Sequence, residues 1–382
     1  MADIKGHCDP RFEKMADLLS ASIDAGTDVG ASVAVTVGGE FVVDIWGGWV
    51  DEAKSAPWEH DTITNVWSST KTMLGLAALV CHDRGLIDVY EPVAMYWPEF
   101  AQNGKEHVTV AQLMSHTSGV SGWAPPFRSA DLYDWDLATS KLAEQPTWWE
   151  PGTQSGYHAI NQGFLVGEVI RRASGMSFKE FFRTEIAEPL GADFQIGVAP
   201  DEAHRVSDII PPEVTGNSRR FIERIGDDSV FAKTFRLDDF GPAEALTPEW
   251  RAADLGAVNG HGNARGAGRV QSVVANGGEV DGVRLLSQDT IDLIFDEQSN
   301  GPDLVLILPV RMGIGYGLVN PALEPHYPDG RICRWGGWGG SSVVVDVDRN
   351  VTITYMMNKM HSGLVGDVRS FNLVRAAYDA LI

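Results

Sequence analysis

The chain has few cysteines and none of the spacing that marks a disulfide-stapled or zinc-held protein. Cys8, Cys81 and Cys333 are scattered through 382 residues, without a Cys-x-x-Cys pair. An odd and unspaced set predicts neither a disulfide framework nor a structural metal, so we expect buried or incidental thiols. Small disulfide-rich scaffolds and zinc-finger domains are thereby excluded.

Positive charge is also scarce, since 30 Lys and Arg stand against 52 Asp and Glu for a net charge of −22. This charge repels phosphate backbones and anionic lipids, and no local basic cluster offsets it. The chain lacks any run of about 18 apolar residues, and residues 1–8 lack the basic start and apolar stretch of a secretory signal. We predict a cytoplasmic protein that binds neither nucleic acid nor membrane; the oligomeric state stays open.

The motifs of two other hydrolase classes are missing. The sequence has no Gly-x-Ser-x-Gly elbow, and none of its ten histidines forms a His-Glu-x-x-His zinc helix. His116 and His261 have no acidic partner at a readable spacing, so we interpret both as structural rather than catalytic. Residues 260–262 lack the preceding strand and later glycine of a nucleotide-binding loop. An α/β-hydrolase triad, a zinc hydrolase and a nucleotide site are therefore disfavoured.

Apolar, β-rich segments near both ends of the chain predict two hairpins. Residues 31–37 and 41–46 flank the turn Gly38-Gly39. Residues 341–347 and 351–357 flank a second, turn-rich centre. A single antiparallel sheet built from both chain ends is the simplest way to satisfy the two hairpins.

Between the hairpins, the apolar pattern changes to a helical period. Capping residues and periodicity predict helices at 109–115, 163–173, 178–186 and 247–254, and another at 365–381. We predict an α+β fold in which helices flank the antiparallel sheet and a mainly helical lobe adjoins it, with the active site in the cleft between them. Residues 118–136 and 200–241 resist regular assignment, and we interpret the first stretch as a pocket wall.

The tetrapeptide Ser68-Ser69-Thr70-Lys71 opens a segment that we interpret as a buried helix. Residues three apart share one helical face, so the Ser68 hydroxyl and the Lys71 amine become neighbours. A serine hydroxyl is a poor nucleophile until a base takes its proton, and a lysine can be that base once its pKa falls well below about 10.4. A helix N-terminus would disfavour the ammonium and offer N–H groups to an oxyanion.

A structural interpretation of the same tetrapeptide is equally available at this point. Ser68 would then be an N-cap and Lys71 a solvated residue of the first turn. Short motifs of this kind also arise by chance. The choice between the two interpretations depends on the motifs elsewhere in the chain.

Five further segments follow the tetrapeptide, and both their residues and their order along the chain are informative. They are residues 113–119, 151–153 with Tyr157, 189–191, 259–265 and 335–341. In this order they resemble the serine β-lactamase and penicillin-binding-protein superfamily, and in particular the family VIII carboxylesterases, which share the class C β-lactamase fold. The resemblance covers most of the chain and implies a β-lactamase/transpeptidase-like fold. It suggests a discontinuous sheet domain, 1–62 and 266–382, and a mainly helical domain, 63–265, that carries the Ser-x-x-Lys helix and the tyrosine motif.

The resemblance also implies roles for individual residues. Ser68 would be the nucleophile, and Lys71 and Tyr157 would share its proton, as a phenolate beside an ammonium stabilises both charged forms. Which of the two is the formal base stays open. The backbone N–H groups of Ser68 and Trp338 would form the oxyanion hole.

Two departures from the β-lactamase pattern indicate the substrate. Trp335-Gly336-Gly337 stands where β-lactamases have Lys-Thr-Gly, so an apolar face replaces the cation that binds a penicillin carboxylate. Tyr157-His158-Ala159 lacks the asparagine of the Tyr-x-Asn motif, which puts efficient β-lactam turnover in doubt. The glycines would allow close approach to a bound acyl group. The candidate pocket walls are Trp123, Trp148, Trp149, Trp335 and Trp338.

We therefore predict a serine carboxylesterase that cleaves small, mostly apolar esters through an acyl-enzyme on Ser68, with no cofactor or metal. An amide hydrolase or acyltransferase of the same superfamily, of the 6-aminohexanoate-dimer hydrolase or D-aminopeptidase type and with weak β-lactamase activity, is the alternative. A non-catalytic relative that senses a ligand or serves in assembly is the hypothesis from a different class.

Overall fold

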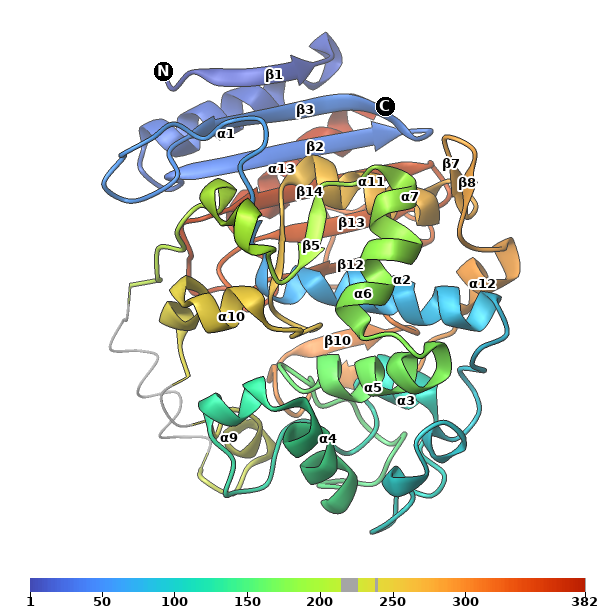
Figure 1. The fold of residues 1–382 in the computed structure, drawn as a ribbon. Coiled ribbons are helices and arrows are strands. Elements are labelled where there is room, and N and C mark those ends of the chain that lie inside the picture. Colours follow the sequence, from blue (N-terminus) through green and yellow to red (C-terminus); the bar gives the residue numbers. More distant parts are fainter. Residues whose placement is uncertain (214–225, 238–239, 382) are drawn as a thin grey trace.

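A nine-stranded antiparallel sheet forms the centre of the molecule (Figure 1), in a computed structural model that describes residues 1–213, 226–237 and 240–381. Its strand order is β1-β3-β2-β14-β13-β12-β11-β10-β9. Three strands come from the beginning of the chain, β1 (Ile4–Cys8), β2 (Gly30–Val37) and β3 (Glu40–Gly48). Six come from its end, β9 (Ser299–Pro302), β10 (Pro309–Met312), β11 (Gly317–Leu318), β12 (Ile332–Gly336), β13 (Ser342–Asp346) and β14 (Val351–Met357). The prediction of one antiparallel sheet built from both chain ends is confirmed.

Both predicted hairpins are present, and they meet at the middle of the sheet. Val37 pairs with Glu40 across the β2–β3 turn, and Asp346 pairs with Val351 across the β13–β14 turn. Strand β14 then pairs antiparallel with β2 along seven residues. All seven residues of β14 are buried. The strand is covered on both faces, so Thr352 and Thr354 are buried as fully as the apolar residues with which they alternate.

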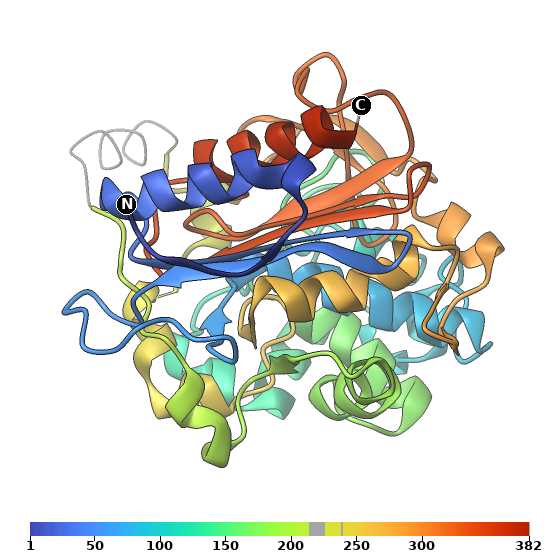
Figure 2. The same ribbon diagram turned by 90° about the horizontal axis from the view of Figure 1, so that it is seen from above.

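Helices cover both faces of the sheet (Figure 2). On one face lie α1 (Glu13–Asp24) and α13 (Val368–Leu381), packed against each other and against the sheet. On the other face lies α11 (Ala264–Ala275), with α2 (Thr70–Asp83) beside it and reaching β12. Almost every side chain of α2 is buried, from Thr70 to Cys81, because the sheet side and the helical lobe both cover it.

The helical lobe and its connections complete the fold. Its remaining helices are α3 (Val110–Met114), α4 (Trp135–Glu144), α5 (Gln162–Ser174), α6 (Phe178–Phe182), α7 (Glu188–Leu190), α9 (Val230–Thr234) and α10 (Pro248–Ala252), and α12 (Gln288–Leu293) packs against α2. Two small sheets hold β4 (Thr64–Asn65), β6 (Gly260–Gly262) and β5 (Phe194–Ile196), and β7 (Glu279–Val280) with β8 (Val283–Arg284). Within the described part of the chain, no helix is long and apolar enough to span a bilayer.

Two predicted helices are shorter in the structure, each for a local reason, and one is longer. The helix predicted at 178–186 runs through α6, a π-helical turn at Arg183–Ala187 and α7, and it ends at Leu190 before Gly191 in a left-handed conformation. The helix predicted at 247–254 ends at Ala252, and Asp254 instead accepts a hydrogen bond from the Lys179 N–H. The last helix begins at Val368, after Gly366 in a left-handed conformation.

The two stretches predicted to be irregular contain short helices. Residues 118–136 include a 3₁₀ turn, Ser129–Tyr133, and the start of α4. Residues 200–241 include the 3₁₀ helix Pro200–Arg205 and α9, while 214–225 and 238–239 lie outside the described residues. The proposed split into domains 1–62 with 266–382 and 63–265 remains a prediction.

Candidate active site

Ser68 lies in a short 3₁₀ turn, Trp67–Ser69, that leads directly into α2. Trp67, the residue before it, has φ +49°, a left-handed conformation that is strained for a bulky side chain. The Trp67 ring is packed between the rings of Trp250 and Trp338, at centroid distances of 5.4 and 5.1 Å. This packing holds the strained turn, so the Ser68 side chain is placed by its neighbours rather than by helix geometry alone.

The Lys71 amine is the nearest basic group to the Ser68 hydroxyl, at 3.3 Å between Nζ and Oγ. Lys71 is 3% exposed and donates two further hydrogen bonds, to the carbonyl oxygens of Ala159 (2.7 Å) and Ala257 (3.0 Å). Burial lowers the Lys71 pKa well below 10.5, and it is the only cause of the shift. The structural interpretation is therefore wrong: Lys71 is not solvated, and Ser68 is not the N-cap of α2, a place that Ser69 takes without a side-chain cap bond.

Tyr157 completes the group around the serine. The Lys71 Nζ lies 4.8 Å from the centre of the Tyr157 ring, and the Tyr157 hydroxyl accepts a hydrogen bond from Trp335 Nε1 at 3.3 Å. Burial raises the pKa of Tyr157, and hydrogen bonds with Ser68 and Trp335 oppose the shift without reversing it. Burial thus favours an uncharged phenol beside an uncharged amine, and not the phenolate and ammonium expected from the sequence.

Strand β12 brings the third motif to the same place. Trp335, 5% exposed, lies with its ring centroid 5.4 Å from that of Tyr157. A Cβ on Gly336 would collide with the backbone of residues 365–366, and one on Gly337 would collide with the Val66 carbonyl. These two glycines therefore allow the protein's own segments to approach, a role that differs from the expected accommodation of an acyl group. Arg334 points to the other side of the sheet, over the ring of Tyr327, as strand alternation predicts.

The turn between β12 and β13 is tied to the serine segment. The Gly337 N–H donates to the Ser341 carbonyl at 2.8 Å. The Ser341 hydroxyl donates to the Val66 carbonyl at 2.8 Å and lies 2.9 Å from the Ser69 hydroxyl. Among the described residues, the backbone N–H of Trp338 donates to no carbonyl. The turn therefore presents an unused N–H group next to the segment that holds Ser68.

The remaining candidate pocket walls lie in the helical lobe. Trp123 donates from Nε1 to the Ala138 carbonyl at 2.9 Å and stacks on Phe127. Trp148 lies against Gly122, and Trp149 covers Gly156, the residue before Tyr157. The contacts of Trp123 are those of a core residue, and the roles of Trp123 and Trp148 in a pocket stay predictions.

His116, which was interpreted from the sequence as a structural residue, lies beside Tyr157 at this site. Its ring lies 4.9 Å from the Tyr157 ring and 6.0 Å from the Trp335 ring, and its Nδ1 accepts from the His158 N–H at 3.1 Å. Burial lowers its pKa well below 6.5, assisted by His158 and Lys71. His116 is thus an uncharged wall of the site, and the motif at 113–119 was the signal that could have indicated its place.

Asp303 is a residue of the site that the sequence did not indicate. Its Oδ1 accepts hydrogen bonds from three backbone N–H groups, those of Tyr157 (3.1 Å), Val305 (2.8 Å) and Leu306 (2.7 Å). The carboxylate is 3% exposed. It fixes the backbone of Tyr157 from a position 146 residues away, and no motif surrounds it.

Replacing Asp303 with alanine should lower the free energy of unfolding by about 3 kcal/mol, because three buried N–H groups lose their acceptor. Asp303→Asn keeps one carbonyl oxygen at the position that accepts all three bonds, so its loss should stay below about 1 kcal/mol. Urea unfolding of both variants measures the difference. Equal losses in the two variants would contradict the assigned contacts.

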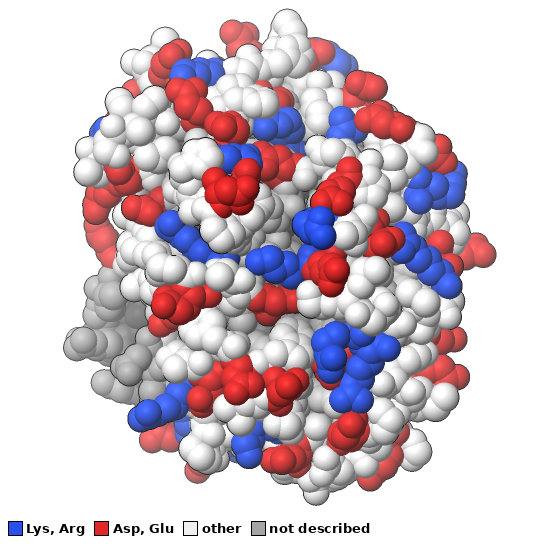
Figure 3. All heavy atoms as spheres, viewed as in Figure 1, with Lys and Arg blue, Asp and Glu red and all other residues white. Residues whose placement is uncertain are grey.

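Metal-ligating side chains do not gather at the site. In residues 1–213, 226–237 and 240–381, no group of three or more His, Cys, Asp and Glu side chains is arranged to hold a metal ion. The charged side chains on the face in Figure 3 are acidic and basic groups interspersed with uncharged ones.

Comparison with known proteins identifies relatives along the whole chain. The family model described as Beta-lactamase matches residues 16–377. The curated protein Esterase/beta-lactamase LipL of Mycobacterium tuberculosis is 34% identical over 397 residues, covering 97% of this chain and 88% of the relative.

Solved structures show the same fold. A crystal structure of a family VIII carboxylesterase superposes with a TM-score of 0.92 at 38% identity, covering 99% of this chain and 100% of the other. A penicillin-binding protein homologue from Caulobacter crescentus superposes with a TM-score of 0.90 at 33% identity, with the same coverage. The predicted β-lactamase/transpeptidase-like fold is therefore confirmed.

Proposed function

The chain belongs to the beta-lactamase family, and we propose that it is a serine carboxylesterase that cleaves small, mostly apolar esters through an acyl-enzyme on Ser68. The single observation that carries the proposal is the 3.3 Å contact between the Ser68 hydroxyl and a buried Lys71 amine whose pKa is lowered. Such a pair supplies both a nucleophile and its base. The names of two relatives, an esterase/beta-lactamase and a family VIII carboxylesterase, support the same reaction class.

In the acylation step, Ser68 Oγ attacks the ester carbonyl while the uncharged Lys71 amine accepts the hydroxyl proton. The tetrahedral intermediate then expels the alcohol, and the Tyr157 hydroxyl donates a proton to the leaving oxygen and recovers one from Lys71. The raised pKa of Tyr157 and the lowered pKa of Lys71 support this assignment, in which Lys71 is the base and Tyr157 the relay. The result is an acyl-serine and a free alcohol.

Deacylation reverses the proton movements. Water attacks the acyl carbonyl and gives its proton to the Tyr157 oxygen while the Tyr157 hydroxyl proton passes to Lys71, and the Ser68 oxygen then leaves with a proton from Lys71. The N–H groups of Ser68 and Trp338 stabilise the oxyanion in both steps. Ser68 supports this role because it stands in the first turn of a helix, where N–H groups lack helical partners. Trp338 supports it through its unused N–H.

A hollow beside Trp335 offers room for a short chain of the ester. It has a volume of about 250 Å³ and a mixed lining, in which Trp335, Leu308, Val310, Leu318, Val365 and Phe371 supply apolar surface and Arg311, Asn320, Glu324 and Arg334 supply polar groups. Arg334 is paired with Glu324 and Arg311 with Glu297, so the apolar side chains are the part of the lining that suits a short acyl or alcohol chain. Trp335 itself borders both this hollow and Tyr157, so it would separate the apolar part of the ester from the proton relay.

A substrate panel tests the proposed function against amide and β-lactam hydrolysis. We expect kcat/KM for short-chain p-nitrophenyl esters to exceed that for nitrocefin and for D-amino-acid p-nitroanilides. Lys71 bonds to a backbone carbonyl at Ala159, where the β-lactamase motif has an asparagine side chain, and this favours the ester. Faster turnover of the amides would instead support the amide hydrolase or acyltransferase.

The pH dependence of ester turnover should report the lowered pKa of Lys71. Lysine acts as a base only when it is uncharged, so kcat/KM should rise with pH and level off above the Lys71 pKa, at a midpoint well below 10.5. Lys105 is the matched control, since burial lowers its pKa to about 8 in a loop that holds it through the Gln102 and Gln145 carbonyls. Lys105→Met should leave the midpoint unchanged. If the midpoint shifts in Lys105→Met, the titration belongs to Lys105 and not to Lys71.

A further inference from the structure

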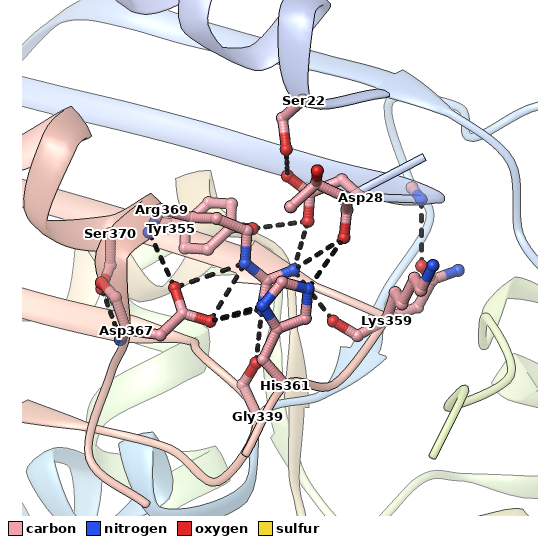
Figure 4. Close-up of polar contacts among 12 residues, drawn as sticks. Ser22, Asp28, Gly339, Tyr355, Lys359, His361, Asp367, Arg369 and Ser370 are labelled. Carbon is pink, nitrogen blue, oxygen red and sulfur yellow. Dashed lines mark hydrogen bonds and ion pairs between the residues drawn. The ribbon is translucent and has the colours of Figure 1, made fainter. Parts of the chain in front are cut away.

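A buried ion-pair network lies behind the β12–β13 turn, centred on Arg369 of α13 (Figure 4). The Arg369 side chain is 5% exposed and forms ion pairs with Asp28 at 2.6 Å and Asp367 at 2.7 Å, whose side chains are 1% and 10% exposed. The Tyr355 hydroxyl also donates to Asp28 Oδ1, at 2.6 Å. A guanidinium this deeply buried persists because its charge is matched by two carboxylates.

Arg369 also donates to three backbone carbonyls from different segments. Its Nη1 donates to the carbonyls of Thr27 (3.3 Å) and Lys359 (2.9 Å), and its Nη2 donates to the carbonyl of Gly339. The planar guanidinium fixes the directions of its N–H donors relative to one another, whereas a lysine ammonium on its flexible stem would not. Only the Gly339 contact reaches the turn that contains Trp338.

Both peptide groups of Gly339 are held. Its N–H donates to the Gly363 carbonyl at 2.8 Å, and its carbonyl accepts from the His361 N–H at 3.0 Å as well as from Arg369. Together with the bond from the Gly337 N–H to Ser341, these contacts fix the backbone on both sides of Trp338. The network leaves the Trp338 N–H as the free donor of a fixed turn.

The glycine at position 340 shows how closely the network and the turn are fitted. A Cβ on Gly340 would collide with Arg369 Nη2 and lie 2.5 Å from Asp367 Oδ2. Gly340 has φ +131° and Gly339 has φ +96°, conformations that side chains rarely adopt. The ion pair is therefore packed directly against the turn rather than merely near it.

We propose that Arg369 is a positioning residue that orients the Trp338 N–H toward the oxyanion, by holding the Gly339 carbonyl from behind the turn. This inference rests on the proposed function, because it deepens the role of Trp338 in ester hydrolysis. An oxyanion donor stabilises the transition state only when its direction is set beforehand, and a rotated peptide loses that effect. Arg369 does not line the hollow beside Trp335, so its replacement should leave KM nearly unchanged.

The test compares an ester with its thiono analogue, p-nitrophenyl butyrate against O-(p-nitrophenyl) thionobutyrate. Sulfur accepts hydrogen bonds poorly, so the thionoester gains little from an oriented N–H group, whereas the ester gains fully. Loss of one oxyanion donor lowers kcat by about 10²–10³-fold, so a misdirected donor in Arg369→Gln should lower ester kcat by about 10-fold or more with KM nearly unchanged. The thionoester rate should fall much less, and the ester-to-thionoester ratio of kcat/KM should drop by about fivefold or more.

Arg205→Gln is the matched control for a purely structural effect. The Arg205 side chain is 15% exposed and is paired with three carboxylates, Glu202, Asp193 and Asp61, and none of its bonds reaches the turn. We expect this variant to lose stability, measured by thermal unfolding, while its ester-to-thionoester ratio stays within twofold of the wild type. A purely structural loss would lower kcat/KM for the ester and for the thionoester by the same factor.

The outcomes separate the two proposals. Wild-type protein that cleaves neither ester would overturn the proposed function itself. Wild-type activity with an unchanged ratio in folded Arg369→Gln would overturn the positioning role and leave the esterase standing. If Arg369→Gln does not fold, Arg369→Lys keeps the charge without the planar fork, and an unchanged ratio in that variant overturns the role equally.

Discussion

Replacing Ser68 with alanine is expected to lower ester kcat by about 10⁴–10⁶-fold, the range seen when a nucleophile is removed from a serine hydrolase. The loss follows from the geometry, since Ser68 is the one hydroxyl among the described residues to which Lys71 Nζ donates, at 3.3 Å. Thermal unfolding should change little, because the alanine side chain fits the space of a serine that makes no helix-capping bond. Hydrolysis of p-nitrophenyl butyrate, followed to long times in concentrated enzyme, measures the residual rate.

Ser69→Ala is the control for this prediction. The Ser69 hydroxyl lies next to Ser68 in sequence, yet it is 2.9 Å from the Ser341 hydroxyl and takes no part in the proposed reaction. A fluorophosphonate probe should label the wild type and Ser69→Ala but not Ser68→Ala. Absence of labelling in folded wild-type protein would support the non-catalytic relative, a ligand sensor or assembly protein, over the enzyme.

Replacing Lys71 with methionine is expected to lower ester kcat by about 10³–10⁴-fold, the upper part of the range for a general base. Methionine fills similar space but cannot accept the Ser68 proton. Lys71→Arg separates the base from a mere positive charge, because arginine remains protonated at every accessible pH. We expect Lys71→Arg to be as inactive as Lys71→Met, measured with the same ester.

Recovery of activity in Lys71→Arg would contradict the assignment of Lys71 as the base. It would indicate that the site needs a cation, and the phenolate of Tyr157 would then be the base that the sequence left open. Burial raises the pKa of Tyr157 and lowers that of Lys71, and both shifts favour the result in which Lys71→Arg stays inactive.

The sequence predicts well those parts of the fold that depend on local patterns. The hairpins around Gly38-Gly39 and residues 348–350 are apolar and β-branched segments broken by turn residues, and both occur as predicted. The Ser-x-x-Lys helix is predicted because its spacing and its apolar continuation agree. Helix ends are less well predicted, since Gly191 and Gly366 set them through backbone preferences that a broad apolar pattern hides.

The supporting residues of the site could not be predicted because their partners are distant along the chain. Asp303 holds the backbone of Tyr157 across 146 residues, and Arg369 pairs with Asp28 across 341. Neither has a motif of its own. The left-handed conformation of Trp67 likewise follows from its packing between two other tryptophans, which only the folded chain brings together.

The preference of Lys71 and Tyr157 for their uncharged forms could not be predicted from the sequence either. A tyrosine and a lysine with ordinary pKa values stabilise each other as ions when they are exposed to water. Full burial reverses this preference, because both ions lose their hydration and the hydrogen-bond partners of Lys71, the Ser68 hydroxyl and two backbone carbonyls, are uncharged. The depth of a side chain is a property of the tertiary structure, and the Ser-x-x-Lys motif carries no information about it.

The central claim, an acyl-enzyme on Ser68, is tested most directly by mass spectrometry of the protein quenched in acid during turnover of a slowly deacylating ester. The mechanism predicts a mass increase equal to the acyl group, mapped by proteolysis to the peptide that contains Ser68 and absent from Ser68→Ala. An adduct on another residue, or ester turnover without any adduct under conditions in which acylation outpaces deacylation, would contradict it.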